Sequence, residues 1–435
     1  MPTQMRLLGF LIHGPINHTI LSWADPRDER VAGLSSIRYW QDLARLLERG
    51  CFDGVFFADL PGVADRYRER VDEAIRYGVC WPTHDPAPLV AIMAAATEHL
   101  GIAITLSQSA HHPYAAVRTL STLDCLTGGR VGWNIVTGHV RGEHRAYGLD
   151  QLEHDERYAR AEEYMEVCYA LWNSIGPGAI RVDRAAGVFA DPAKVRRVTH
   201  HGRYFRTDTI GPTLPSPQHH PVLFQAGSSG RGQQFALRHA EVIFSIQPHA
   251  AGMRRFMQQL HDAARARGRT APVRVTFAVQ PILGGTEEEA RRHQRELVER
   301  IPIEAGLCRL SSTLGVDFSR FDLDQPLDEL DTQASRGMMA AMSGAMAGRR
   351  VTLREAAMHY GASTGILQIP GTPEQVAGQL VALWRATGCF GFNVTPTINN
   401  SSIADFVDQV VPLLQREGVL RTEYRGKTFR DTLND

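Results

Sequence analysis

Short apolar runs and stretches of helical periodicity alternate along most of the chain. Each apolar run ends at polar or glycine-rich residues, which is typical of a buried strand followed by a loop. The predicted strands are residues 7–12, 55–58, 102–106, 131–136, 222–225, 242–246, 273–283 and 392–395. The predicted helices are residues 36–49, 88–99, 114–126, 231–239, 250–267, 373–387 and 403–417, with one more after His154. The pattern therefore predicts a repeating order of strand and helix.

Two long stretches interrupt this alternation. Residues 176–221 are rich in Gly, Pro, His and Arg, with a short hairpin predicted around residues 202–205. Residues 301–368 contain a helical segment rich in Met and Ala, which includes Met338, Met339, Met342 and Met346. We interpret both stretches as large insertions into one domain that spans residues 1–435.

Eight predicted strands joined by helices define the fold class as α/β. Buried parallel strands with helical connections suit either a closed (β/α)8 barrel or a doubly wound open sheet. Eight strand and helix units favour the closed TIM barrel, and large barrels with insertions exceed 400 residues as one domain. In such a barrel the functional residues are expected at the carboxyl ends of the strands.

Composition narrows the class of protein further. The 435 residues include 47 Lys and Arg and 47 Asp and Glu, so no charge bias favours nucleic acid or an anionic membrane surface. The cysteines Cys51, Cys80, Cys125, Cys168, Cys308 and Cys389 are scattered without a CxxC pair, as expected for reduced thiols. No apolar run is long enough for a signal sequence or a membrane span, and we expect a cytoplasmic protein.

The strand at residues 131–136 carries one polar side chain, Asn134, in an otherwise apolar run. Alternation places Asn134 on the same face as Gly132 and Val136, while Trp133 points to the opposite face. A buried amide without partners costs about 1–3 kcal/mol on mutational scales. Asn134 must therefore meet either a neighbouring strand or a polar ligand.

Several motifs resemble one family, the nitrilotriacetate and dibenzothiophene-sulfone type of flavin-dependent monooxygenase within the bacterial luciferase-like superfamily. The motifs are residues 129–138 (GRVGWNIVTG), 39–48 (YWQDLARLLE), 52–59 (FDGVFFAD), 112–114 (HPY) and 226–229 (AGSS). Near the N-terminus the family often has Trp-Arg-His-Pro, and here residues 23–26 are Trp-Ala-Asp-Pro. The resemblance implies a (β/α)8 barrel.

The resemblance also implies an activity. It implies a two-component monooxygenase that takes reduced FMN (FMNH2) from a separate NAD(P)H:flavin reductase. Such an enzyme uses O2 to oxygenate a small organic substrate through a C4a-(hydro)peroxyflavin. A homodimer or homotetramer is implied as well. The absence of a second nucleotide fingerprint in the sequence agrees with an external reductase.

Polar residues that follow the predicted strands should converge at one end of the barrel. They are His13, Asp59, Ser107, Gln108, Asn134, Thr137, Gln225 and Gln247. The loop of Ala226, Gly227, Ser228 and Ser229 stands before a helix, where backbone N–H groups can bind an anion. By resemblance this loop binds the FMN phosphate with His154 and Tyr158, and Asn134 and Thr137 lie by the isoalloxazine or ribityl chain. Asp59 and Ser107 complete the candidate cofactor site.

Histidines are the candidates for acid or base catalysis. His13, His18, His112 and His139 fall in loops predicted at the barrel end, where imidazole can titrate near neutral pH. No HExxH motif is present, and the paired histidines are adjacent in sequence, so no metal site is expected.

Three alternatives remain open from the sequence. One is an F420-dependent oxidoreductase of the same superfamily, and another is a flavin-binding protein without turnover. The third is a metal-dependent barrel hydrolase.

Overall fold

Eight parallel strands close into a barrel in the computed structural model, which describes residues 4–138, 140–227, 229–330 and 350–435. The strands are β1 (Arg6–Ile12), β2 (Gly54–Ala58), β3 (Gly101–Ser107), β4 (Val131–Val136), β9 (Val222–Gln225), β10 (Val242–Ser245), β11 (Val275–Leu283) and β13 (Gly391–Val394). Each pairs in parallel with its neighbours, and the β1–β13 and β10–β11 pairings close the ring. The predicted TIM barrel is confirmed.

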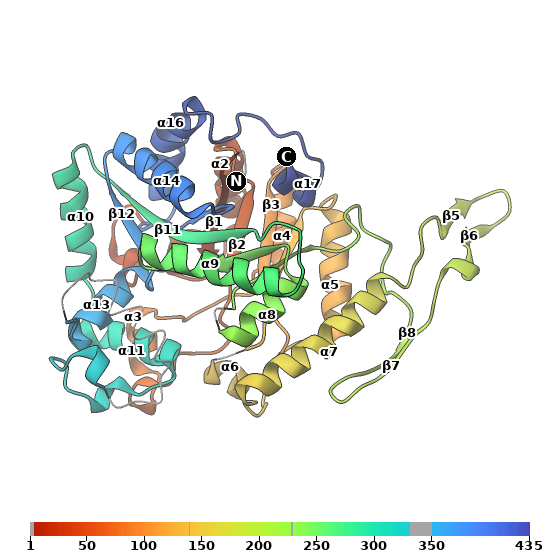
Figure 1. Cartoon of the computed structure of the whole chain (residues 1–435), viewed down its shortest axis with the longest axis horizontal. Coiled ribbons are helices and arrows are strands. Elements are labelled where there is room, and N and C mark those ends of the chain that lie inside the picture. The colour runs from red at the N-terminus through yellow and green to blue at the C-terminus, as the bar shows by residue number, and fades with distance from the viewer. Residues whose placement is uncertain (1–3, 139, 228, 331–349) are drawn as a thin grey trace.

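Helices cover the outside of this barrel (Figure 1). They are α2 (Ile37–Arg49), α4 (Ala87–Ala94), α5 (Pro113–Leu126), α7 (His154–Trp172), α8 (Gly230–His239), α9 (Ala250–Ala266), α10 (Glu287–Glu299), α14 (Pro373–Thr387), α15 (Ser401–Asp405) and α16 (Val411–Arg416). The helix predicted at residues 88–99 extends five residues beyond the end of α4. The chain leaves the helix after Ala94, where Arg130 donates a hydrogen bond of 2.8 Å to the Ala94 carbonyl.

A ninth strand, β12 (Leu367–Gly371), pairs with β11 outside the closed ring. β11 is long enough to pair with β13 over Thr276–Val279 and with β12 over Val279–Leu283. This strand was not among the predicted strands, and the second interruption was expected to extend to residue 368. Its sequence, LQIPG, has only two strongly apolar residues and gives a weak strand signal.

The first interruption forms two antiparallel hairpins that project away from the barrel (Figure 1). They are β5 (Ile180–Asp183) with β6 (Val188–Ala190), and β7 (Val198–His201) with β8 (Arg206–Thr209). The turn of the second hairpin lies at the predicted position. Within the second interruption, α11 (Ile303–Leu314) and α13 (Leu353–Ser363) pack with α3 (Asp72–Tyr77) around a separate apolar cluster. The predicted methionine cluster lies outside the described residues.

The C-terminal helix α17 (Phe429–Asn434) seals the end of the barrel where the strands begin. A Cβ atom on Gly101 would lie 2.1 Å from the Phe429 ring, so that strand needs glycine to admit the ring. Figure 1 shows α17 on the side of the barrel opposite α3, α6 (Arg141–Ala146) and α11. The carboxyl ends of the strands therefore form the open end, which we call the barrel mouth.

None of the described helices combines the length and the apolar character needed to cross a lipid bilayer.

Candidate functional site

Asn134 points into the barrel and Trp133 points away from it, so the two lie on opposite faces of β4, as the alternation predicted. Trp133 packs in the layer between barrel and helices, and Gly132 faces the interior beside Ala103 and Phe224. The Asn134 side chain is buried, with 4% of its surface exposed. Its Nδ2 donates to Thr105 Oγ1 at 2.8 Å, and the Thr105 hydroxyl donates to the Phe57 carbonyl at 2.8 Å.

This chain of hydrogen bonds orients the amide, because Thr105 accepts the Asn134 NH2 group and holds Oδ1 on the other side. Oδ1 is buried and has no partner among the described residues. Gln108 follows β3, and its Nε2 is likewise buried without a hydrogen-bond partner among the described residues. The carboxyl ends of β3 and β4 therefore hold one buried unpaired donor and one buried unpaired acceptor among the described residues.

The residues predicted for an anion lie close together at the start of α8. Ser229 caps this helix through its Oγ, which accepts from Gly232 N at 3.0 Å and lies 3.0 Å from His154 Nε2. The Tyr158 hydroxyl lies beside Gly232, where a Cβ atom would be 2.6 Å from it. Burial raises the pKa of Tyr158, and hydrogen bonding to Ser229, Gln225 and Thr137 opposes that rise.

The loop before α8 needs glycine for close packing. A Cβ atom on Gly227 would lie 2.7 Å from Gly232 Cα and 2.8 Å from the Gln225 amide. Gly227 N donates to Gln225 Oε1 at 2.6 Å, while Ala226 is exposed. Ser228 lies outside the described residues. The start of α8 thus lies beside His154 and Tyr158, and the N-terminus of a helix suits a phosphate.

Carboxylates gather beside β2 and β3 at the mouth. Ser107 Oγ donates to Glu143 Oε1, and burial raises the pKa of Glu143. Burial, with Asp85 and Glu143 as nearby negative charges, raises the pKa of Asp59 to about 7. Glu143 and Asp85 were not predicted from the sequence, because each lies in a short polar segment that resembles an exposed stretch.

Two of the candidate histidines, His13 and His18, are buried in the loop that follows β1. His13 Nδ1 lies 2.9 Å from the Asp85 carbonyl, and its ring meets Trp40 edge to face, so its polar atoms contact protein groups. His18 stacks on Phe10 with ring centroids 4.1 Å apart, and neither of its ring nitrogens has a partner among the described residues. Burial lowers the pKa of His18 to about 3, so this ring is neutral at physiological pH.

The other two histidines differ in position. His112 caps α5, accepting from Tyr114 N at 3.2 Å, and its exposed ring meets Phe205 of the first insertion. It is therefore on the outer side of the barrel. His139 lies outside the described residues. No group of three His, Cys, Asp or Glu side chains suited to a metal ion occurs within the described parts of the chain.

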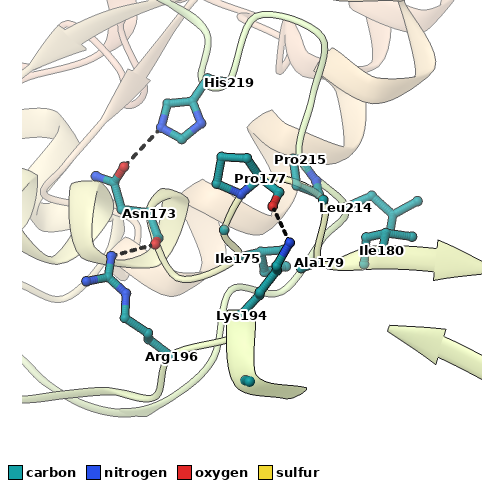
Figure 2. A pocket seen from close by; sticks show the side chains of 13 residues that line it. Asn173, Ile175, Pro177, Ala179, Ile180, Lys194, Arg196, Leu214, Pro215 and His219 are labelled. Atoms are coloured by element: carbon teal, nitrogen blue, oxygen red, sulfur yellow. Dashed lines mark hydrogen bonds between the residues drawn. The ribbon is translucent and has the colours of Figure 1, made fainter. Parts of the chain in front are cut away.

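A large cavity of about 970 Å³ lies away from the mouth, at the base of the β5–β6 hairpin (Figure 2). Its polar groups contact one another. His219 Nε2 lies 3.2 Å from Asn173 Oδ1, and Arg196 donates to the Asn173 carbonyl at 2.9 Å. None of its lining residues follows a barrel strand, so this cavity is not the site that the strand ends build.

Comparison with known proteins gives concordant results. The profile of the family described as luciferase-like monooxygenase matches residues 18–389. The dibenzothiophene-sulfone monooxygenase of Rhodococcus erythropolis (strain XP) is 39% identical over 99% of this chain and 96% of its own. Nitrilotriacetate monooxygenase component A of Aminobacter aminovorans is 35% identical, covering 92% of this chain and 90% of its own.

Solved structures agree. A crystal structure of riboflavin lyase with modified FMN and riboflavin superimposes with a TM-score of 0.91 at 34% identity, over 99% of this chain and 96% of that one. An F420-dependent secondary alcohol dehydrogenase shares only the fold, at 13% identity and a TM-score of 0.58, over 93% of this chain and 98% of that one. The chain therefore belongs to the luciferase-like monooxygenase family, in the group that includes the dibenzothiophene-sulfone and nitrilotriacetate enzymes.

Proposed function

We propose that this luciferase-like monooxygenase binds reduced FMN at the barrel mouth and uses O2 to oxygenate a small organic molecule. The observation that carries the proposal is the pair of buried, unpaired amide atoms, Asn134 Oδ1 and Gln108 Nε2. A flavin ring offers N–H and carbonyl groups that such a pair can bind. Relatives over the full chain length are named monooxygenases, and one solved relative contains a modified FMN.

The phosphate and the ring of the flavin would bind at different parts of the site. Ser229, His154 and Tyr158, with the N–H groups at the start of α8, would hold the phosphate. Asn134 and Thr137 would bind the ring or the ribityl chain, with Ser107 and Asp59 beside them. These residue assignments rest on the contacts described above and on the family resemblance.

Bound reduced flavin supplies the electrons that activate O2. The chain itself would orient the ring through Asn134, whose amide is held by Thr105. The Ser107–Glu143 hydrogen bond holds α6 at the end of β3. At neutral pH the His18 ring beside Phe10 can accept or donate a hydrogen bond only as neutral imidazole.

A partner must supply the reduced cofactor. We infer a separate NAD(P)H:flavin reductase, in line with a relative that is named as component A of its system. We also propose a homodimer or homotetramer, and a cytoplasmic location for the assembly.

The direct test is isotopic. The purified protein is incubated with FMN, NADH, a flavin reductase and ¹⁸O2, together with a panel of sulfones, sulfides, amines and organic acids. Mass spectrometry should find a product that contains one ¹⁸O atom and depends on the reductase. Binding of flavin without a labelled product across the panel would favour a flavin-binding protein without turnover.

A further inference from the structure

Arg309, on α11, is a buried cation without an acidic partner. Only 6% of its surface is exposed, and it forms no ion pair with any described carboxylate. Its one side-chain hydrogen bond in the described structure runs from Nη1 to Cys80 Sγ. Burying a guanidinium without a counter-charge is costly, and a sulfur atom compensates little of that cost. Packing of α11 therefore does not explain why an arginine stands here.

α11 packs on the loop that follows β1, because its apolar residues share a buried cluster with Ile16 and Ile20. The Arg309 charge acts on the His18 ring, where it lowers the pKa after burial, and on the Tyr360 phenol. Hydrogen bonds from the second insertion hold this part of the chain in place. Thr364 Oγ1 donates to the His18 carbonyl at 3.1 Å, and Thr19 Oγ1 donates to the Ala362 carbonyl at 2.9 Å. α11 and α13 thus bring a cation to the loop that follows β1.

An apolar surface adjoins this cation. His18 stacks on Phe10, whose ring centroid lies 4.8 Å from that of Phe244, and Phe56 lies 5.1 Å from Phe244. Both ring nitrogens of His18 remain unpaired within the described chain. The mouth therefore combines aromatic rings with one unpaired cation and one neutral hydrogen-bonding group.

We propose that the substrate is a small organic anion whose carboxylate or sulfonate group binds Arg309 and His18 while its apolar part packs on Phe10 and Phe244. This inference rests on the proposed function, since it names the substrate class of that site. A guanidinium binds a planar or tetrahedral oxyanion through paired N–H donors. A neutral substrate would leave Arg309 unpaired and buried, and the site discriminates against it for that reason.

The test compares anions with neutral compounds of the same shape. Benzenesulfonate is paired with methyl phenyl sulfone, and octanoate with octanamide. Binding is measured by anaerobic calorimetry on the protein saturated with reduced FMN, and again on the flavin-free protein. We expect each anion to bind at least about tenfold more tightly than its neutral partner, as for a hydrogen-bonded charge. Two variants, Arg309→Met and Arg309→Lys, are measured in the same way.

Arg309→Met should remove the preference for anions and leave the affinity of the neutral compounds unchanged, whereas Arg309→Lys should retain part of the preference. Because Arg309→Met removes an unpaired buried charge, its melting temperature should be equal to or above that of the unchanged protein. Equal affinities within each pair, no binding of either anion, or a preference that survives in Arg309→Met would overturn the proposal. Failure of reduced FMN to bind would instead refute the proposed function, because the flavin-free titrations report on the anion alone.

Discussion

Replacing Asn134 with alanine separates a ligand-binding amide from a structural one. The change removes one hydrogen bond, from Nδ2 to Thr105, which contributes about 0.5–1.5 kcal/mol to stability. It also removes the unpaired Oδ1, whose burial costs about 1–3 kcal/mol. The two effects offset each other, so the free energy of unfolding of the flavin-free protein should change by no more than about 1 kcal/mol.

Binding should respond differently. With Oδ1 lost, reduced FMN loses an acceptor that the Thr105 contact holds in position, and affinity should fall by about 1–3 kcal/mol, roughly 5- to 150-fold. Denaturant unfolding gives the stability, and anaerobic calorimetry with reduced FMN gives the affinity. Asn173→Ala is the control, because Asn173 follows α7 beside the hairpin cavity and its side chain contacts the Tyr169 carbonyl and His219, far from the mouth.

Either of two results would contradict a cofactor-binding role for Asn134. If Asn134→Ala destabilises the flavin-free protein by several kcal/mol, the amide has a structural role in the barrel interior. If affinity for reduced FMN is unchanged, Asn134 does not contact the cofactor.

Three further changes test other parts of the account. The pKa of Asp59 is raised to about 7 in the folded protein, so its ionisation disfavours folding. The stability that Asp59 contributes is therefore full below pH 4 and is lost as the pH rises toward 7. The melting temperature of Asp59→Asn should therefore fall less over that pH range than that of the unchanged protein. Identical melting temperatures at every pH would contradict the raised pKa of Asp59. Tyr158→Phe should weaken the binding of FMN, measured by fluorescence, and leave riboflavin, which has no phosphate, unaffected; an equal loss for both ligands would remove Tyr158 from the phosphate site. Phe429→Ala removes the ring that fills the closed end of the barrel, and the free energy of unfolding in urea should fall by about 3–5 kcal/mol. A fall of less than about 1 kcal/mol would show that the Phe429 ring is not needed for stability.

The order of strands and helices was enough to predict the barrel, and alternation along β4 was enough to place Asn134 and Trp133 on opposite faces. What remained hidden depends on contacts across the sheet. Thr105 lies opposite Asn134 in the β3–β4 register, and only that pairing shows why the amide has a free oxygen. The sequence marked Asn134 as polar in an apolar strand but contained no sign of its partner.

Residues that become buried through contacts distant in the sequence could not be predicted from local patterns either. Glu143 lies in a short helix between β4 and α7, and its burial comes from the contact with Ser107, 36 positions earlier. Arg309 lies on α11 in the second interruption. Helical spacing does not show that this helix packs on the loop after β1. His18 was a candidate from its loop position, yet its low pKa follows from burial against Phe10, which no spacing reveals.

The central claim is that the barrel mouth binds reduced flavin and controls its reaction with oxygen. The most direct measurement is an anaerobic titration with reduced FMN, followed by rapid mixing with oxygenated buffer while the flavin spectrum is recorded. The account predicts saturable binding and a long-lived flavin species whose spectrum differs from those of both reduced and oxidised FMN. Absence of binding, or reoxidation at the rate of free flavin, would contradict it.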